Sequence, residues 1–282
     1  FMDEPTAALT QAETDRLLTV VRTLSAAGVA VVFVSHRLAE VLDIASRVTV
    51  LRDGKLVGVY PTAGMSQSRL TELMTGKTFD KVVAARDTAA LKPVLEVSGL
   101  TRTGDYEDVT FTLRAGEVLG VTGLIGAGRT ELAHTLFGMT RADRGSIKLN
   151  GAQVHFASNR DAIAAGIGYV SEDRLALGLI QPQSIADNLV MTIPARISDA
   201  SGLISSSQKS ATVNKWIGDL SIKVGRPENA VSTLSGGNQQ RIVLAKWLAT
   251  NPKVLILDCP TVGVDVGARA GIYAIVRQLA QK

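Results

Sequence analysis

The stretch Gly123-Leu-Ile-Gly-Ala-Gly-Arg-Thr130 decides which fold this chain can adopt. The apolar run Val118–Val121 precedes it and predicts a buried strand, and the residues from Glu131 onward predict a helix. A strand, a glycine-rich turn and a helix make up the P-loop, in which backbone N–H groups and the helix N-terminus hold a phosphate. The P-loop pattern has Lys where this chain has Arg129, which keeps the charge but carries it on a longer planar group. The residues predicted to bind nucleotide here are Gly123, Leu124, Ile125, Gly126, Ala127, Gly128, Arg129, Thr130 and Glu131.

The composition indicates a folded protein and disfavours several classes. Hydrophobic residues make up 46% of the 282 residues, which is enough for packed cores. The net charge of +4 is a mild excess without a basic cluster interleaved with aromatic residues, so no nucleic-acid groove is predicted. The single cysteine, Cys259, permits no disulfide within the chain and fits a reducing compartment. No apolar run approaches the roughly 18 residues of a membrane span.

An internal repeat defines the organisation of the chain. Residues 2–10, MDEPTAALT, match residues 257–265, LDCPTVGVD, so that Asp3 pairs with Asp258 and Pro5 with Pro260. The chain is therefore expected to contain the end of one unit and most of a second. We expect the C-terminal part of a first domain at 1–76, a charged linker at 77–93, and a second domain at 94–282 that lacks its C-terminal end.

Strands alternate with helices along both units, which predicts the α/β fold class. The unbroken β-branched run Val29–Val34 predicts a strand buried on both faces, and Asp53-Gly54 between two apolar runs predicts a hairpin. Further strands are expected at 94–97, 109–113, 146–149, 167–170 and 254–257, and helices at 11–27, 37–45, 66–74, 187–196, 205–220, 238–249 and from 272 onward.

An acid that ends an apolar strand behind a P-loop commonly forms the second half of a nucleotide site. Asp258 and Thr130 fit this arrangement, because the carboxylate holds Mg²⁺ directly or through water while the hydroxyl takes another position. Asp3 has the same role in the first unit, whose own P-loop would lie before residue 1. Taken alone, such an acid is equally consistent with a buried strand that ends in a turn; the P-loop and the repeat favour nucleotide binding.

Glu4 and His36 are the candidate catalytic residues. A carboxylate beside Mg²⁺ can align and deprotonate the attacking water, and Glu4 directly follows Asp3. His36 comes just after a predicted strand, at the sheet edge where ligands bind in α/β folds. The structural alternatives are a helix-capping acid for Glu4 and a capping or exposed imidazole for His36.

A third motif lies at Leu234-Ser-Gly-Gly-Asn-Gln-Gln-Arg241. Two glycines expose backbone N–H groups at the start of a predicted helix, and Ser235 adds a hydroxyl, so this turn is also a candidate anion site. The alternative is an ordinary N-cap. The predicted nucleotide-binding residues of this turn are Ser235, Gly236, Gly237 and Asn238.

These motifs together resemble one protein family. LSGGNQQR at 234–241 resembles the signature motif of the ABC ATPases, and DEPTAALT at 3–10 and SHRLAEV at 35–41 resemble their Walker B motif with its D-loop and their switch-histidine loop. The P-loop, YVSEDR at 169–174, the signature motif and LILDCPTVGVD at 255–265 follow in the order of one ABC nucleotide-binding domain. The resemblance covers nearly the whole chain and is closest to the tandem ATPase subunits of bacterial monosaccharide importers (ribose, galactose, xylose or arabinose type).

The resemblance implies a P-loop NTPase fold of the ABC type, with a helical subdomain and an antiparallel β subdomain, and ATP with Mg²⁺ as cofactors. It implies that two ATPase domains close head to tail, each ATP lying between one P-loop and the other signature motif. Glu172 matches the Q-loop position, which contacts Mg²⁺ or water. Cys259 departs from the pattern, because it occupies the place of the catalytic carboxylate and a thiol is a poor base for water. The second unit is thus expected to bind nucleotide without hydrolysing it.

The resemblance also implies partners and a location. We expect a pair of integral-membrane sugar permease subunits, a periplasmic or extracellular sugar-binding protein and no nucleic acid, with the subunit on the cytoplasmic face of the bacterial plasma membrane. One alternative is a regulatory ABC-like module that binds nucleotide without catalysis, and another is a soluble ABC protein acting on ribosomes or DNA. Because Glu4 and His36 share a predicted site with a P-loop that would precede Phe1, we expect this chain alone to have little ATPase activity.

Overall fold

A computed structural model of the chain describes residues 1–6, 9–52, 54–76, 90–124, 126–264 and 266–281. The chain divides into two compact units, unit 1 (Phe1–Ala84 with Asp265–Ala270) and unit 2 (Ala85–Val264 with Gly271–Lys282). Most of the predicted linker at 77–93, Asp53 of the predicted hairpin and Ile125 of the P-loop lie outside the described residues, and the predicted domain boundaries stay a prediction.

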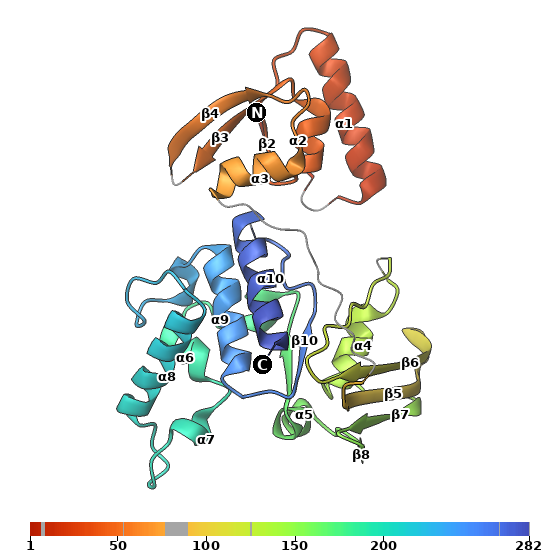
Figure 1. Cartoon of the computed structure of the whole chain (residues 1–282), viewed down its shortest axis with the longest axis vertical. Coiled ribbons are helices and arrows are strands. Elements are labelled where there is room, and N and C mark those ends of the chain that lie inside the picture. The colour runs from red at the N-terminus through yellow and green to blue at the C-terminus, as the bar shows by residue number, and fades with distance from the viewer. Residues whose placement is uncertain (7–8, 53, 77–89, 125, 265, 282) are drawn as a thin grey trace. The chain divides into compact units, whose positions relative to one another are not determined.

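Unit 1 contains a short parallel strand pair, three helices and a hairpin (Figure 1). Thr10 begins α1 (Gln11–Ala26) with a capping box, in which Thr10 and Glu13 each satisfy a backbone N–H of the other. The remaining elements are β1 (Met2–Asp3), β2 (Phe33–Val34), α2 (Leu38–Ile44), the hairpin strands β3 (Arg47–Arg52) and β4 (Lys55–Pro61), and α3 (Gln67–Thr75). The core cluster that joins α2, α3 and the hairpin consists of Leu38, Val50 and Leu70.

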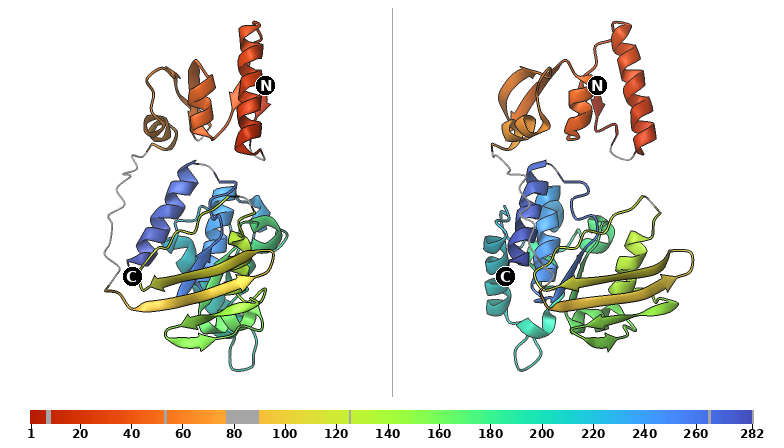
Figure 2. Two further views of the ribbon diagram at one scale, coloured as in Figure 1. Left: turned by 90° about the vertical axis from the view of Figure 1, so that its right-hand side faces the viewer. Right: turned by 45° about the vertical axis from the view of Figure 1, so that its right-hand side comes forward.

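Unit 2 contains a four-stranded antiparallel sheet in the order β6-β5-β7-β8. The sheet is built from β5 (Pro93–Arg102), β6 (Tyr106–Arg114), β7 (Arg144–Leu149) and β8 (Ala152–Val154), which Figure 2 shows side by side as one twisted layer. The helix α4 (Arg129–Leu136) packs on β6, where the Tyr106 hydroxyl donates to Thr135 Oγ1 at 2.7 Å. The antiparallel β subdomain implied by the resemblance is present, and it supports the helix that follows the P-loop.

The rest of unit 2 is a parallel strand pair with helices. The strands β9 (Ile167–Val170) and β10 (Val254–Leu257) pair in register, and α9 (Gly236–Leu248) packs on β9. The helices α6 (Ile185–Val190) and α8 (Ser206–Asp219) pack together, and α6 contacts α9, which forms the helical part of the fold (Figure 1). The other helices of unit 2 are α5 (Asn159–Ala165), the π-turn η1 (Arg174–Gly178), α7 (Pro194–Ile197) and the 3-10 turn η2 (Val231–Thr233). The last helix, α10 (Val266–Ala280), has its first residues in the segment grouped with unit 1 and the rest in unit 2.

Two predicted strands are corrected by the structure. Residues Val118–Val121 form no strand, and the side chains of Val118 and Val121 are 62% and 54% exposed, so the predicted burial is wrong. Of the run Val29–Val34 only the last two residues form a strand, and Val29 is 48% exposed. In both cases the apolar pattern is real, but a strand requires hydrogen bonds to a neighbour. Among the described residues, only β1 pairs with the second run and nothing pairs with the first.

Among the described residues, no helix combines the length and the hydrophobicity that crossing a membrane requires.

Candidate functional site

The end of β10 places Asp258 in a buried position in unit 2. The Asp258 side chain is 8% exposed, and its backbone N–H donates to Val170 on β9 at 2.9 Å. Its Oδ2 accepts a hydrogen bond of 3.1 Å from the hydroxyl of Tyr169. Burial, followed by the nearby Asp258 charge, raises the pKa of Tyr169, so this hydroxyl stays a donor. Tyr169 thus donates to one oxygen of this carboxylate, a contact that the sequence motif YVSEDR did not reveal.

Three predicted residues converge beside this strand end. The ligand atoms of Glu172, Asp258 and Cys259 all lie within 4.8 Å of one another. Two carboxylates fit Mg²⁺, which prefers hard oxygen ligands, whereas a thiol does not. Burial, then the charges of Glu172 and Asp258, raise the pKa of the Cys259 thiol. The thiol is therefore neutral near pH 7, and a neutral thiol is a poor ligand for Mg²⁺ and a poor base for water.

The P-loop turns tightly into α4. Gly126 and Gly128 have φ of 81° and 80°, a conformation that favours glycine, and α4 begins directly after Gly128. A Cβ at Gly128 would lie 2.2 Å from the carbonyl oxygen of Asp105, so this position also needs glycine for space. The first turn of α4 carries Arg129, Thr130 and Glu131, and its backbone N–H groups are free of intrahelical partners by geometry.

Arg129 is electrostatically coupled to the carboxylate cluster. Its charge lowers the pKa of Cys259, against the larger effects of burial and of Glu172 and Asp258. Arg129 therefore lies near enough to the end of β10 for its charge to act on Cys259. A cation and carboxylates in one region are the groups that a phosphate with a divalent cation requires.

The serine of the signature turn does not act as an ordinary cap. Ser235 precedes α9 with extended backbone angles, yet its side chain makes no capping hydrogen bond. Its hydroxyl instead accepts from Asn238 Nδ2 at 3.1 Å, and Asn238 Oδ1 accepts from the backbone N–H of Lys223 at 3.2 Å. The N–H groups of the first turn of α9 remain available to an anion, so the geometry disfavours the N-cap alternative.

In unit 1, Glu4 and His36 contact each other. Glu4 Oε1 lies 2.8 Å from His36 Nδ1 and accepts the His36 backbone N–H at 3.0 Å. The second oxygen, Oε2, is buried and has no hydrogen-bond partner among the described residues. A buried carboxylate oxygen without a partner costs free energy unless water or a ligand satisfies it. Asp3, by contrast, is exposed.

The structure brings the predicted residues together in two sets, one in each unit. Glu4 with His36 form one set, and Glu172, Asp258 and Cys259 form the other. The two sets lie in different units, and the head-to-tail pairing of ATPase domains that the resemblance implies stays a prediction. Ile125, predicted to bind nucleotide, lies outside the described residues.

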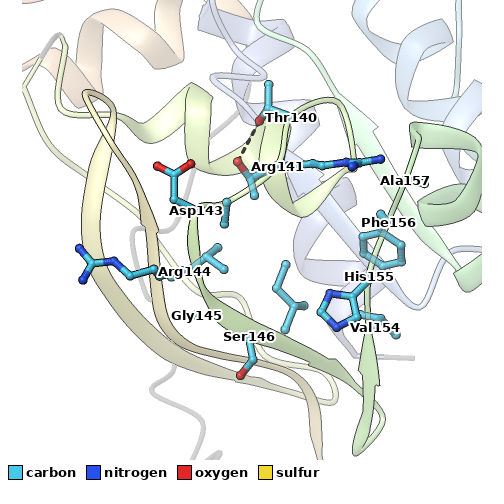
Figure 3. Close-up of a pocket in the computed structure, with 14 residues that line it drawn as sticks. Thr140, Arg141, Asp143, Arg144, Gly145, Ser146, Val154, His155, Phe156 and Ala157 are labelled. Atoms are coloured by element: carbon cyan, nitrogen blue, oxygen red, sulfur yellow. Dashed lines mark hydrogen bonds between the residues drawn. The ribbon is translucent and has the colours of Figure 1, made fainter.

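A separate hollow of about 470 Å³ lies beside β7 and β8. Figure 3 shows Thr140 and Arg141 on one side of it and the His155 ring pointing into it from the other. None of the residues predicted to bind nucleotide is among the described residues that line it. The candidate site therefore rests on the P-loop and the strand ends rather than on this hollow.

Comparison with known proteins identifies relatives of this chain. The family described as "ABC transporter" matches residues 106–262, which is more than half of the chain. A ribose import ATP-binding protein of Streptomyces avermitilis is 45% identical over 280 residues, covering 99% of this chain and 55% of that protein. The corresponding protein of Halalkalibacterium halodurans is also 45% identical, over 100% of this chain and 56% of its own length. The chain thus spans about half the length of these relatives.

Solved structures agree on the fold. A nucleotide-free ATP-binding cassette of an ABC transporter superposes with a TM-score of 0.58 at 18% identity, over 67% of this chain and 78% of that one. A dimeric cassette in a post-hydrolysis state, bound to ADP and phosphate, superposes with a TM-score of 0.57 at 18% identity, over 66% of this chain and 83% of that one. At this identity the likeness establishes the fold alone, and the α/β prediction of the ABC type is confirmed.

Proposed function

From the premise that this chain belongs to the ABC transporter family, we propose that it is part of the ATP-binding subunit of a monosaccharide importer. Support comes from relatives named as ribose import ATP-binding proteins, which match along nearly the whole chain. The observation that carries the proposal is the cluster of Glu172, Asp258 and Cys259 beside a P-loop whose Arg129 acts on the same thiol. This is a site for a phosphate chain with a divalent cation.

In unit 2 the proposed work is binding. The turn Gly123–Thr130 and the N-terminus of α4 hold the phosphates, with Arg129 contributing charge. Glu172, Asp258 and Thr130 hold Mg²⁺, which when bound neutralises charge on the phosphate oxygens. Tyr169 fixes one oxygen of Asp258 and so orients the carboxylate. Since the Cys259 thiol stays protonated, this site retains nucleotide without activating water.

In unit 1 the proposed work is catalysis. His36 occupies Oε1 of Glu4, so the partnerless Oε2 is the oxygen that accepts a proton from the attacking water. His36 thereby orients the base, and its other ring nitrogen remains for the γ-phosphate. Asp3 is the proposed Mg²⁺ ligand here. In unit 2, Ser235, Gly236, Gly237 and Asn238 are the proposed nucleotide-binding residues at the start of α9.

The proposed partners are a pair of membrane permease subunits and an extracytoplasmic sugar-binding protein, with the subunit peripheral on the cytoplasmic face. The side chains of Leu175, Leu177 and Ile180, shortly after Glu172, are 55%, 61% and 48% exposed. Exposed apolar side chains next to a nucleotide-contacting residue are suited to a protein partner. The sugar would be selected by the permease and the binding protein.

Titration of the chain with a fluorescent ATP analogue in the presence of Mg²⁺ tests the binding part of this proposal. We expect saturable binding that Arg129→Ala weakens about tenfold or more, because a charge-assisted contact to phosphate is lost. Arg141→Ala is the matched control, since Arg141 is exposed and is not among the proposed site residues. Binding that is absent, or equally strong in Arg129→Ala, would exclude a nucleotide site at this P-loop.

A further inference from the structure

Arg174 donates two hydrogen bonds that have no role in the proposed function. It begins η1, two residues after Glu172, and its guanidinium reaches a loop far along the chain. Nη1 donates to the carbonyl oxygen of Val262 at 2.8 Å and Nη2 donates to that of Gly263 at 3.0 Å. A planar guanidinium suits two adjacent acceptors, whereas an ammonium group serves them as a point charge.

The loop that Arg174 holds is the one that leaves the strand end. It begins at Cys259, whose φ of 45° is rare for a residue with a side chain, and it contains Gly263 with a φ of 64°. Within it, the backbone N–H of Val262 donates to Cys259 at 3.1 Å. The Val262 side chain is 49% exposed, and burial resumes only at Val264, which is 3% exposed. The middle of the loop is therefore held by Arg174 rather than by packing of its own side chains.

The signature turn closes on the same contact. A Cβ added to Gly236 would lie 2.9 Å from Arg174 Nη2 and 2.9 Å from the Gly263 carbonyl oxygen. Gly236 has no positive φ, so its glycine is required by space and not by backbone conformation. Three segments therefore meet at Arg174: the segment after Glu172, the loop after Cys259 and the start of α9.

The far end of η1 is tied down as well. Lys246 on α9 is 4% exposed, and its ammonium donates to the carbonyl oxygen of Gly178, the last residue of η1. At the near end, Asp173 accepts the backbone N–H groups of Leu175 and Ala176 at 3.1 and 2.9 Å. The turn is thus fixed at both ends by polar contacts, while Leu175 and Leu177 between them are exposed. A partner that displaces the exposed side of η1 would therefore also displace the residues bonded to its two ends.

We propose that Arg174 is a positioning residue that couples the segment 172–178 to the loop 259–263, so that the two move as one body. A displacement of η1 then shifts Cys259 and the turn at the start of α9 together. In the reverse direction, nucleotide binding changes the position of Leu175 and Leu177. The contact is present in the structure, and its role in transmitting nucleotide binding rests on the proposed function.

The lone thiol of the chain provides the test. Cys259 is the only cysteine, so modification by a thiol reagent reports on the loop without added mutations. The rate of modification would be compared in the wild-type chain, Arg174→Met, Arg174→Lys and the matched control Arg141→Met. Hydrogen exchange of residues 259–264 would be measured in parallel, so that local loosening is distinguished from general loosening of unit 2.

We expect Arg174→Met to raise the modification rate of Cys259 about tenfold, because the loop loses both charged hydrogen bonds. Faster exchange should be confined to 259–264 and to the first turn of α9. Arg174→Lys should restore part of the protection, since one ammonium can reach one carbonyl, and Arg141→Met should behave as wild type. If Arg174→Met fails to fold, Gly236→Ala displaces the same loop from the opposite side and should accelerate modification likewise.

A Cys259 rate unchanged in Arg174→Met overturns the proposal, and so does a faster exchange spread evenly through unit 2, which would indicate a purely structural role. Adding MgATP separates the two proposals. If MgATP fails to protect Cys259 in the wild-type chain while Arg174→Met still accelerates modification, the nucleotide site is wrong and the coupling stands. If MgATP protects Cys259 and Arg174→Met changes nothing, the coupling is wrong and the nucleotide site stands.

Discussion

The strand ends Asp3-Glu4 and Asp258-Cys259 share a residue with positive φ and differ in side-chain chemistry. Glu4 and Cys259 have φ of 46° and 45°, and each follows a short strand in a parallel pair. Around them the side chains diverge, because Glu4 binds His36 while Cys259 faces two carboxylates. The positive φ after the strand is therefore common to both units, whereas the type of residue at that position differs.

The aspartates differ as well. Asp258 is 8% exposed and accepts the Tyr169 hydroxyl, whereas Asp3 is exposed. A buried carboxylate is costly unless it is hydrogen-bonded, so unit 2 orients this ligand firmly. If the two aspartates hold Mg²⁺ as proposed, the ligand in unit 2 is the better fixed of the two, which fits the proposed division into a binding site and a catalytic site.

The largest expected effect is the difference between substituting Glu4 and substituting Cys259. In a form of the protein with the full length of its relatives, Glu4→Gln should lower the ATPase rate by about 10²- to 10⁴-fold, because the proton acceptor is lost. Cys259→Ser should change the rate by less than about twofold, since the thiol takes no part. Steady-state phosphate release measures both. Equal losses in the two variants would show that the strand ends are not divided in function.

The next effect concerns the buried aspartate. Tyr169→Phe should lower the free energy of unfolding of unit 2 by about 1–3 kcal/mol, because a buried carboxylate loses its donor. Urea unfolding followed by hydrogen exchange in each unit measures this. Tyr60→Phe in unit 1, whose ring packs on the core cluster, is the control and should cost less than about 0.5 kcal/mol. A loss of equal size in both variants would exclude a specific role for the Tyr169–Asp258 contact.

A smaller effect is a pH dependence confined to unit 2. Burial lowers the pKa of Lys246 on α9 to about 8, from an ordinary value of 10.5. Between these values the unfolded chain binds more protons than the folded chain, so the stability contributed by Lys246 rises with pH from 8 to 10.5 and is lost as pH falls through 8. Lys246→Met should flatten this part of the stability profile. A profile identical to that of the wild type would contradict the buried ammonium.

The smallest effect concerns the thiol itself. Because Glu172 contributes to the raised pKa of Cys259, Glu172→Gln should lower that pKa and speed alkylation at pH 8 by about threefold. The pH profile of alkylation by iodoacetamide measures this, with the exposed Glu107→Gln as control. No shift of the profile toward lower pH would mean that Glu172 does not face the thiol.

Sequence reasoning identified the parts of the site that depend on local pattern. The P-loop glycines and the two matching strand ends follow from residue type and spacing, and the structure gives Gly126, Gly128, Glu4 and Cys259 the positive φ that tight turns require. Sequence reasoning did not find the long-range contacts. The hydrogen bonds from Tyr169 to Asp258 and from Arg174 to Val262 each join residues that are more than eighty positions apart.

The wrong strand predictions have a different cause. Val118–Val121 has the apolar pattern of a buried strand, but a strand also needs a neighbour to accept its hydrogen bonds. The hydrophobic pattern shows which side chains a segment could bury as a strand. Hydrogen bonding to a neighbouring strand decides whether that strand forms. Among the described residues that pairing is absent, so the run remains irregular and exposed.

Phosphate release from MgATP by the purified chain tests the division between the two strand ends most directly. Glu4 and the P-loop Gly123–Thr130 belong by this account to different sites, and the site with the P-loop has Cys259 in place of a base. The account therefore predicts that the chain binds nucleotide and releases phosphate no faster than background. Steady release that Glu4→Gln abolishes would contradict it.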